Sequence, residues 1–360
     1  MSDVYRRLAT RLNEMPHGFP PTESGVELKI LEKIFSEDDA SLALKLRNIP
    51  EAAVAISERI GVSQTELVPR LDLMAEKGQI GRFRWGETTF YLLMPFVVGI
   101  YEFQMYRIDR ELAELFEEYA PTLMGTLGGF APAMARVVPI HEAIENRGEI
   151  LPFEDITKII EDSQSFVEND CICRKERSLL GDPCSHTRTA CLAFSREENA
   201  FNAFPLGGKR LTKDEAKKLL SNAEQEGLVH NIFYNTGTGH FAVCNCCPCC
   251  CGLIRGLKDF GAPHVLARSN YEATIDVDTC SSCGICAEER CPMGAITEDN
   301  GKYAVDRGRC IGCGVCQVTC PTEAISLLRR PEAERSKPPA TFMEWILERA
   351  KNRGVELKIE

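Results

Sequence analysis

Apolar residues recur at helical spacing near the start of the chain. Val26, Ile30 and Ile34 fall four residues apart, so they lie on one face of a helix. Residues 52–60 form a second compact apolar segment, which Gly61 ends. This periodicity predicts two short amphipathic helices.

A third helix and a hairpin are expected next. Residues 63–66 read Ser-Gln-Thr-Glu, a capping box that starts a helix, and Gly78 stops it. Residues 80–84 and 89–93 alternate between apolar and polar side chains on either side of Gly86. Helices followed by a hairpin resemble a winged helix-turn-helix domain, which we expect over residues 1–105.

The charge of this region argues against a DNA reader. Residues 1–108 contain 13 Lys and Arg against 15 Asp and Glu. Glu66 and Asp72 lie on the outward face of the expected recognition helix, where they would meet phosphates. Pro69 also removes a helical hydrogen bond. We therefore expect a module that docks on a partner protein and binds no specific DNA.

Two further segments show helical periodicity. Residues 106–150 are expected to form a helical connector, with an acidic helix over 110–119 and then an apolar segment broken by Gly and Pro over 121–139. Residues 331–360 are expected to form a polar tail. Its short amphipathic helix around Trp345 should fold back on the body.

The net charge and the number of cysteines indicate which class of protein to expect. The 360 residues carry a formal net charge of −11 and include 18 cysteines. No secretory signal is visible, and the longest apolar stretch, residues 88–101, is too short to span a membrane. Because the cytosol keeps thiols reduced, we expect a cytoplasmic protein whose cysteines bind metal.

Eight cysteines near the C-terminus form two copies of one pattern. The first copy is Cys280, Cys283, Cys286 and Cys291, and the second is Cys310, Cys313, Cys316 and Cys320. A thiolate at every third residue, followed by a fourth beside a proline, is the ligand spacing of a cubane iron–sulfur cluster. The repeat continues past the ligands, so it indicates a duplicated fold unit.

This pattern resembles the bacterial two-cluster [4Fe-4S] ferredoxins over roughly residues 272–328, and we expect the ferredoxin domain to span residues 263–330. In that family each fourth cysteine serves the other cluster, so the resemblance implies two ligand sets. Cluster I would take Cys280, Cys283, Cys286 and Cys320, and cluster II would take Cys310, Cys313, Cys316 and Cys291. The first copy has one extra residue before its fourth cysteine, which we expect to form a local bulge. Zinc is the alternative at these sites, but three evenly spaced cysteines followed by a Cys-Pro pair favour iron–sulfur clusters.

Ten more cysteines lie upstream, in residues 151–262, a region expected to be rich in helix. They are Cys171, Cys173, Cys184, Cys191, Cys244, Cys246, Cys247, Cys249, Cys250 and Cys251. In an extended chain, residues two apart point the same way, so Cys171 and Cys173 should reach one centre, as should Cys244 and Cys246. Adjacent cysteines point apart, so the second group can supply two centres.

The Cys-Ile-Cys-Arg and Cys-Asn-Cys-Cys sequences resemble a group of iron–sulfur proteins of anaerobes, which implies a modular electron carrier. We expect one or two further iron–sulfur clusters here, with no grouping assigned. The count also allows two five-ligand clusters of the heterodisulfide-reductase kind, although the spacing differs from that motif. The other alternative is a structural zinc site of Cys171, Cys173, Cys184 and Cys191, with His186 as a further candidate.

Together these features predict a multidomain α+β protein that relays single electrons through several [4Fe-4S] clusters. No glycine-rich nucleotide loop is visible, so no organic cofactor or catalytic residue is assigned. The expected partner is a flavoprotein or a molybdenum or tungsten enzyme. The alternatives are an enzyme with an open iron site and a redox-responsive regulator.

Overall fold

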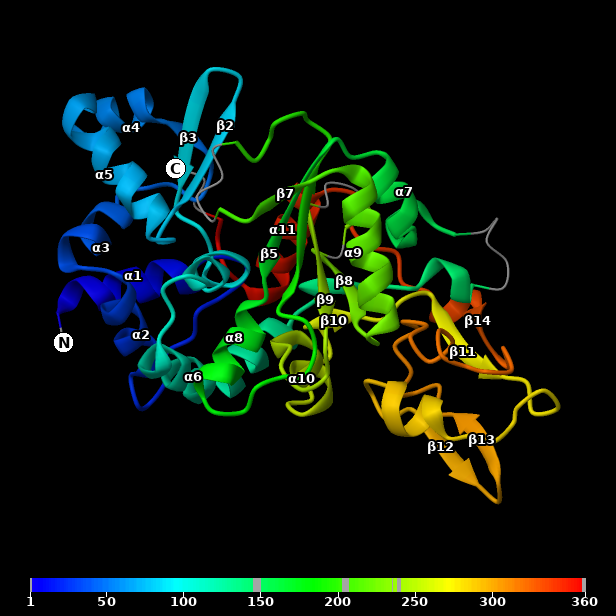
Figure 1. The fold of residues 1–360 in the computed structure, drawn as a ribbon. Helices are drawn as coiled ribbons and strands as arrows, with labels where there is room; N and C mark the ends of the chain where they lie inside the picture. The colour runs from blue at the N-terminus through cyan, green and yellow to red at the C-terminus, as the bar shows by residue number, and fades with distance from the viewer. Residues whose placement is uncertain (1, 145–149, 203–206, 235, 238–240, 358–360) are drawn as a thin grey trace.

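The computed structural model describes residues 2–144, 150–202, 207–234, 236–237 and 241–357. It is a mixed α/β structure in which an N-terminal helical region, a central sheet and a projecting C-terminal unit follow one another along the chain (Figure 1).

The N-terminal region contains helices and a hairpin where they were expected after residue 22, and one helix before it, α1 (Asp3–Asn13), that was not expected. Its other helices are α2 (Val26–Ile34), α3 (Glu37–Ala43), α4 (Ala53–Ile60) and α5 (Gln64–Glu76). Its strands are β1 (Glu51–Ala52), β2 (Gly81–Trp85) and β3 (Thr88–Leu92), in the order β1-β3-β2. The expected capping box is wrong, because the Ser63 side chain makes no capping bond and instead lies 3.1 Å from the Thr65 hydroxyl. The likeness to a winged helix stays a prediction.

The connector differs from the sequence expectation. Helix α6 (Arg110–Gly129) continues through Pro121 and the glycines that were expected to break it. Packing accounts for this continuity, because Leu123 and Leu127 are buried against the core. At Gly128 an added Cβ would lie 2.2 Å from the Ala262 Cβ, so the glycine allows close approach of another segment.

The Cys-rich region was expected to be rich in helix. The structure shows instead that it is built on a β-sheet. The sheet has seven strands in the order β10-β4-β8-β9-β6-β5-β7. They are β4 (Ala135–Val138), β5 (Ser165–Asp170), β6 (Thr189–Ser195), β7 (Lys209–Leu211), β8 (Val229–Phe233), β9 (Ala242–Cys246) and β10 (Leu266–Ala267). Strand β10 lies inside the range expected for the ferredoxin unit, yet it pairs with β4 of this sheet.

Helices cover both faces of the sheet. Helices α7 (Ile156–Glu161) and α9 (Lys213–Gln225) pack on one face, against alternate side chains such as Phe166 and Leu192. On the other face, Val167 and Ala193 join the core that includes α6. Helices α8 (Ile172–Leu179) and α10 (Gly252–Lys258) lie near α6 (Figure 1).

The projecting unit repeats one arrangement. Strand β11 (Tyr271–Ile275) pairs with β14 (Ile325–Arg329), and β12 (Ile296–Asp299) pairs with β13 (Lys302–Val305). The Asp276 amide donates to the Ala324 carbonyl at 2.8 Å, and the Asp306 amide makes the matching bond to Ala295 at 2.7 Å. These equivalent bonds match the duplication seen in the sequence.

The C-terminal helix folds back on the body, as expected. In α11 (Phe342–Arg353), the indole of Trp345 is fully buried and donates to the Ala133 carbonyl at 2.9 Å. Arg349 donates to the Pro16 carbonyl at 3.0 Å, which joins the two ends of the chain. Across the described ranges, no helix combines the length and the apolar character needed to cross a membrane.

Candidate metal centres

The eight C-terminal cysteines surround two separate cavities. One is lined by Cys280, Cys283, Cys286 and Cys320, and the other by Cys291, Cys310, Cys313 and Cys316. Backbone amides donate to the sulfurs, from Ala295 to Cys291 at 3.1 Å and from Ala273 to Cys310 at 3.5 Å. Thiols with amide donors form a suitable environment for a cubane cluster. The grouping matches the predicted exchange of fourth cysteines, and the ligand assignment itself stays a prediction.

The two cavities differ in exposure. Around the first, which we call site I, Cys283 is exposed. Around the second, site II, Cys310, Cys313 and Cys316 are buried. The Ile140 amide, just after β4, donates to the Cys313 carbonyl at 3.0 Å. Site I therefore lies toward the solvent, whereas site II lies toward the body of the protein.

The extra residue of the first motif forms a wide turn. Residues Cys286–Arg290 adopt a single π-helical turn, closed by a bond from the Cys291 amide to the Cys286 carbonyl at 3.0 Å. A π turn holds one more residue than an α turn, so the structure absorbs the insertion locally. The turn ends on Arg290, which donates to the Glu224 and Gln225 carbonyls at 2.8 and 2.9 Å.

Eight of the upstream cysteines line one cavity of about 260 Å³ between the sheet and α6. Two of them, Cys247 and Cys250, also belong to the second group described below. The other six, which we call the cavity thiols, are Cys171, Cys173, Cys191, Cys244, Cys246 and Cys251. Cys191 and Cys244 are direct cross-strand partners in β6 and β9, so their side chains lie side by side. Cys171 and Cys173 also reach this cavity, but α8 begins between them, so the assumption of an extended chain there was wrong.

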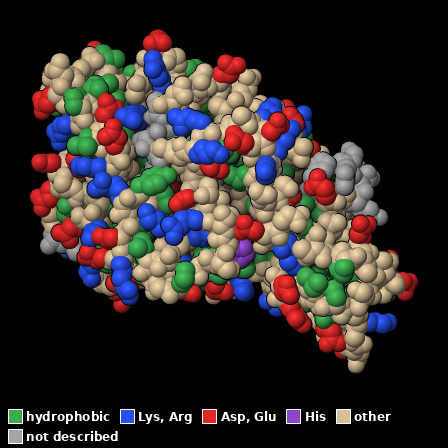
Figure 2. All heavy atoms as spheres, viewed as in Figure 1, with side chains coloured by type: hydrophobic (Ala, Val, Ile, Leu, Met, Phe, Trp, Pro, Cys, Tyr) green, Lys and Arg blue, Asp and Glu red, His purple; other side chains and the backbone are tan. Residues whose placement is uncertain are grey.

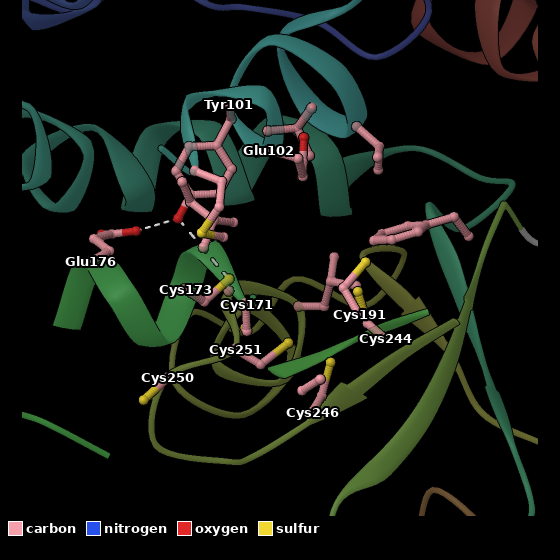
Figure 3. A pocket seen from close by; sticks show the side chains of 18 of the residues that line it. Tyr101, Glu102, Cys171, Cys173, Glu176, Cys191, Cys244, Cys246, Cys250 and Cys251 are labelled. Atoms are coloured by element: carbon pink, nitrogen blue, oxygen red, sulfur yellow. Dashed lines mark hydrogen bonds between the residues drawn. The ribbon is translucent and has the colours of Figure 1, made fainter. Parts of the chain in front are cut away.

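Polar side chains line the same cavity as the thiols (Figure 3). Tyr101 and Glu102 come from the segment after β3, and Glu176 comes from the second turn of α8. The Tyr101 hydroxyl donates to the Glu176 carboxylate and lies 4.0 Å from the Cys173 sulfur. The sequence analysis missed these residues. Only the spacing of Glu176 from Cys173 along one helix gave a signal for them.

Burial changes the acidity of these groups. Loss of water raises the pKa of Glu102 to about 7, although the Gly99 amide donates to its carboxylate at 2.6 Å. Burial also raises the pKa of Glu176 to about 7, and the bond from Tyr101 only partly opposes this. The cavity therefore contains two carboxyl groups that can hold protons near neutral pH.

The other four upstream cysteines form a compact group, the four-thiol group, at the edge of this region. They are Cys184, Cys247, Cys249 and Cys250, and their sulfur atoms all lie within 4.8 Å of one another. This arrangement is compatible with a further metal centre, including an iron–sulfur cluster. It differs from the alternative zinc set of Cys171, Cys173, Cys184 and Cys191, since only Cys184 of those four belongs to it.

Adjacent Cys246 and Cys247 both line the cavity, and Cys247 also belongs to the four-thiol group. Adjacent Cys249 and Cys250 both belong to that group, so the expectation that neighbouring cysteines point apart does not hold for them. Figure 3 shows the sulfur of Cys250 directed away from the cavity thiols. Arg174 lies between the groups, with its guanidinium bound to the Asn245 carbonyl at 2.9 Å and to the Cys247 thiol. Its charge compensates thiolates on both sides. Its position beside Cys173 was the only sequence signal for this role.

Comparison with known proteins identifies the C-terminal unit. Residues 272–335 match the family model of the 4Fe-4S dicluster domain. The chain is 36% identical over 75 residues to the electron transport protein HydN of Escherichia coli K12, which covers 20% of this chain and 43% of that protein. It is 38% identical over 60 residues to the pyruvate synthase subunit PorD of Methanocaldococcus jannaschii, covering 16% of this chain and 69% of PorD.

A third relative belongs to an ion-translocating oxidoreductase complex of Methanosarcina acetivorans. The chain is 36% identical to this subunit over 75 residues, which cover 19% of this chain and 28% of the relative. The chain thus spans less than half of HydN and of the Methanosarcina protein. These matches agree with the paired cavities and show that the chain carries a 4Fe-4S dicluster domain, which binds two [4Fe-4S] clusters. Through residues 272–335, the chain belongs to the 4Fe-4S dicluster proteins.

Proposed function

We propose that the protein relays electrons between a docked redox partner and the cavity thiols, through cluster I and then cluster II. When bound, the clusters supply reversible one-electron transfer. The cysteines of sites I and II are the proposed ligands, in the grouping given above. The cavity thiols would hold at least one further iron–sulfur cluster, since they offer six sulfur ligands around one cavity.

The proposal rests on the difference in solvent exposure between the cysteines of site I and those of site II. Cys283 of site I is exposed, whereas three cysteines of site II are buried and the loop of site II contacts the body. An electron that enters from outside would meet site I first. Two of the cavity thiols, Cys246 and Cys251, are buried as well, and the other four are half-buried. The step from exposed site I to buried site II is the one that a relay from a docked partner requires.

Charge around site I indicates the kind of partner. Glu288 and Glu289, on the π turn beside Cys286, are exposed, as are Asp276 and Asp278 nearby. Figure 2 shows hydrophobic-class and acidic side chains together on this projecting unit. An acidic rim around an exposed apolar patch suits a partner with a basic docking surface. We propose an oxidoreductase as this partner, in the cytoplasm, with residues 1–105 as a second docking module.

Electron transfer to horse cytochrome c, a basic one-electron acceptor, tests the proposal. The dithionite-reduced protein should transfer electrons to it, and the rate should fall as salt is added. Replacing Glu288 and Glu289 with lysine should slow the reaction at low salt, whereas Glu348→Lys, at an exposed position of α11, should not. Equal rates for all three proteins would contradict docking at site I.

A second candidate function is reduction of a small molecule inside the cavity. The observation in its favour is the wall of the cavity, where Glu102 can hold a proton beside a space of about 260 Å³. Cyanide is a suitable probe, since it binds the open iron of a cluster that only three cysteines hold. A change in the electron paramagnetic resonance (EPR) spectrum that Glu102→Gln preserves but Cys251→Ser abolishes would support an open site there. An unchanged spectrum would leave electron relay as the function.

A further inference from the structure

The four-thiol group is built from two loops that lie far apart in sequence. Cys184 comes from the loop between α8 and β6, and the other three cysteines come from the loop between β9 and α10. The Cys184 sulfur lies 3.6 Å from that of Cys247 and 3.5 Å from that of Cys249. The sulfurs of Cys249 and Cys250 are 3.5 Å apart.

These separations fit a single metal ion. Four thiolates in a tetrahedron, each about 2.3 Å from the ion, lie about 3.8 Å from one another. In a cubane cluster each thiolate binds a different iron, so the sulfurs stand farther apart. The sulfur separations at sites I and II provide a comparison within the same protein. Among the described residues, the quartets of sites I and II do not form a set of ligand atoms within 4.8 Å, and the four-thiol group does.

The surroundings also suit a fixed ion. Cys247 and Cys250 are buried against Ala223 and Leu228, near the end of α9. Arg174 binds the Cys247 thiol and also donates to the Thr187 carbonyl at 2.7 Å, so it ties the two loops together. On the outer side, a ring nitrogen of His186 lies 3.1 Å from the Cys184 sulfur. Metal sites commonly have such outer contacts, which orient the ligands.

We propose that Cys184, Cys247, Cys249 and Cys250 hold one metal ion in tetrahedral coordination by four thiolates, and that this ion is zinc. Closed sites of four cysteines are a common setting of structural zinc. The ion would fix the loop between β9 and α10, whose neighbouring residues Cys246 and Cys251 both face the cavity. It would thus position two of the cavity thiols without carrying electrons itself.

Metal and sulfide analysis of the anaerobically purified full chain tests this site. The native protein should contain one zinc, and absorption spectra at the zinc edge should show four sulfurs at about 2.3 Å. Cys184→Ser should lose the zinc and keep the acid-labile sulfide of the clusters. Cys249→Ser changes the exposed ligand and gives the same test if the first variant misfolds. The control Cys251→Ser should lose iron and sulfide while keeping the zinc.

The outcomes distinguish between zinc, a single iron ion and a cubane cluster at this site. If Cys184→Ser loses one iron and no sulfide, the single-ion site stands and its metal is iron. If both variants lose about four iron with equal sulfide and the native protein has no zinc, the group holds a cubane cluster and the proposal is overturned. None of these results depends on electron transfer to a partner, so the proposed function is tested separately.

Discussion

Glu102 should make the free energy of unfolding depend on pH, and the burial of its side chain sets the size of this effect. Its carboxyl group faces the cavity, where burial raises its pKa from the ordinary value of 4.5 to about 7. Between these values the folded protein holds a proton that the unfolded chain has lost. The free energy of unfolding should therefore fall as pH rises from about 4.5 to about 7, and the loss should be complete above that range.

The expected magnitude is on the order of 3 kcal/mol, since each pKa unit corresponds to about 1.4 kcal/mol. Glu102→Gln removes the titration, while the amide oxygen can still accept the bond from Gly99. At pH 8 the variant should therefore be more stable than the native protein by up to this amount. At pH 5 the two should differ little. Glu176 remains in the variant and should keep its own, similar slope.

Urea unfolding under anaerobic conditions, followed by circular dichroism at pH 5 and pH 8, measures the effect. Glu58→Gln, on an exposed face of α4, is the matched control and should follow the native protein at both pH values. A Glu102→Gln protein within about 0.5 kcal/mol of the native one at pH 8, the range of an ordinary surface change, would refute the reasoning.

Two further predictions concern site II. Cys313→Ser should weaken cluster II and leave cluster I largely intact, so the magnetic coupling between the two reduced clusters should disappear from the EPR spectrum. An unchanged coupled signal would contradict the ligand assignment. Gly312→Ala should destabilise the same loop and lower its iron content, because the new Cβ would lie 2.1 Å from the Tyr271 carbonyl oxygen at a φ of +68°. Gly301→Ala, at a φ of +78° with nothing within 4 Å, should retain its iron.

Local spacing made the C-terminal unit predictable. The regular placing of Cys310, Cys313 and Cys316 reflects ligand geometry within a few residues, and the duplication repeats it. The N-terminal helices were predictable for a similar reason, since their apolar residues follow one period. The segment after Pro121 was not, because its helix depends on packing against distant residues such as Ala262.

The grouping of the upstream cysteines could not be predicted from the sequence, for a different physical reason. Strand pairing between β6 and β9 brings Cys191 beside Cys244, and no local pattern fixes that register. In the same way, Cys184 joins cysteines more than 60 residues away. Tyr101 and Glu102 enter the site from a segment with no cysteine at all. Even the expected alternation of adjacent thiols does not hold throughout, since the sulfurs of adjacent Cys249 and Cys250 lie 3.5 Å apart.

The inserted residue of the first cluster motif leads to a last prediction. Its π turn ends on Arg290, which donates to the Val315 carbonyl in the loop of site II at 3.2 Å and to the Glu224 carbonyl of α9 at 2.8 Å. The Glu224 side chain lies 3.1 Å from His230, whose other ring nitrogen is 2.7 Å from Asn245, between two cavity thiols. Contacts thus run without a break from site II to the cavity.

Arg290→Ala should open this junction, because a hydrogen bond from a charged group contributes about 1.5–3 kcal/mol. Clusters I and II should still form, since Arg290 is not a ligand, but electrons should pass more slowly to any cluster in the cavity. Freeze-quenched EPR after mixing with a reductant would follow each cluster in turn. Arg309→Ala removes a bond within the ferredoxin unit, to the Met293 carbonyl, and is the matched control. If the cavity cluster of Arg290→Ala fills as fast as in the control, the insertion only lengthens a turn, and electrons reach the cavity by another route.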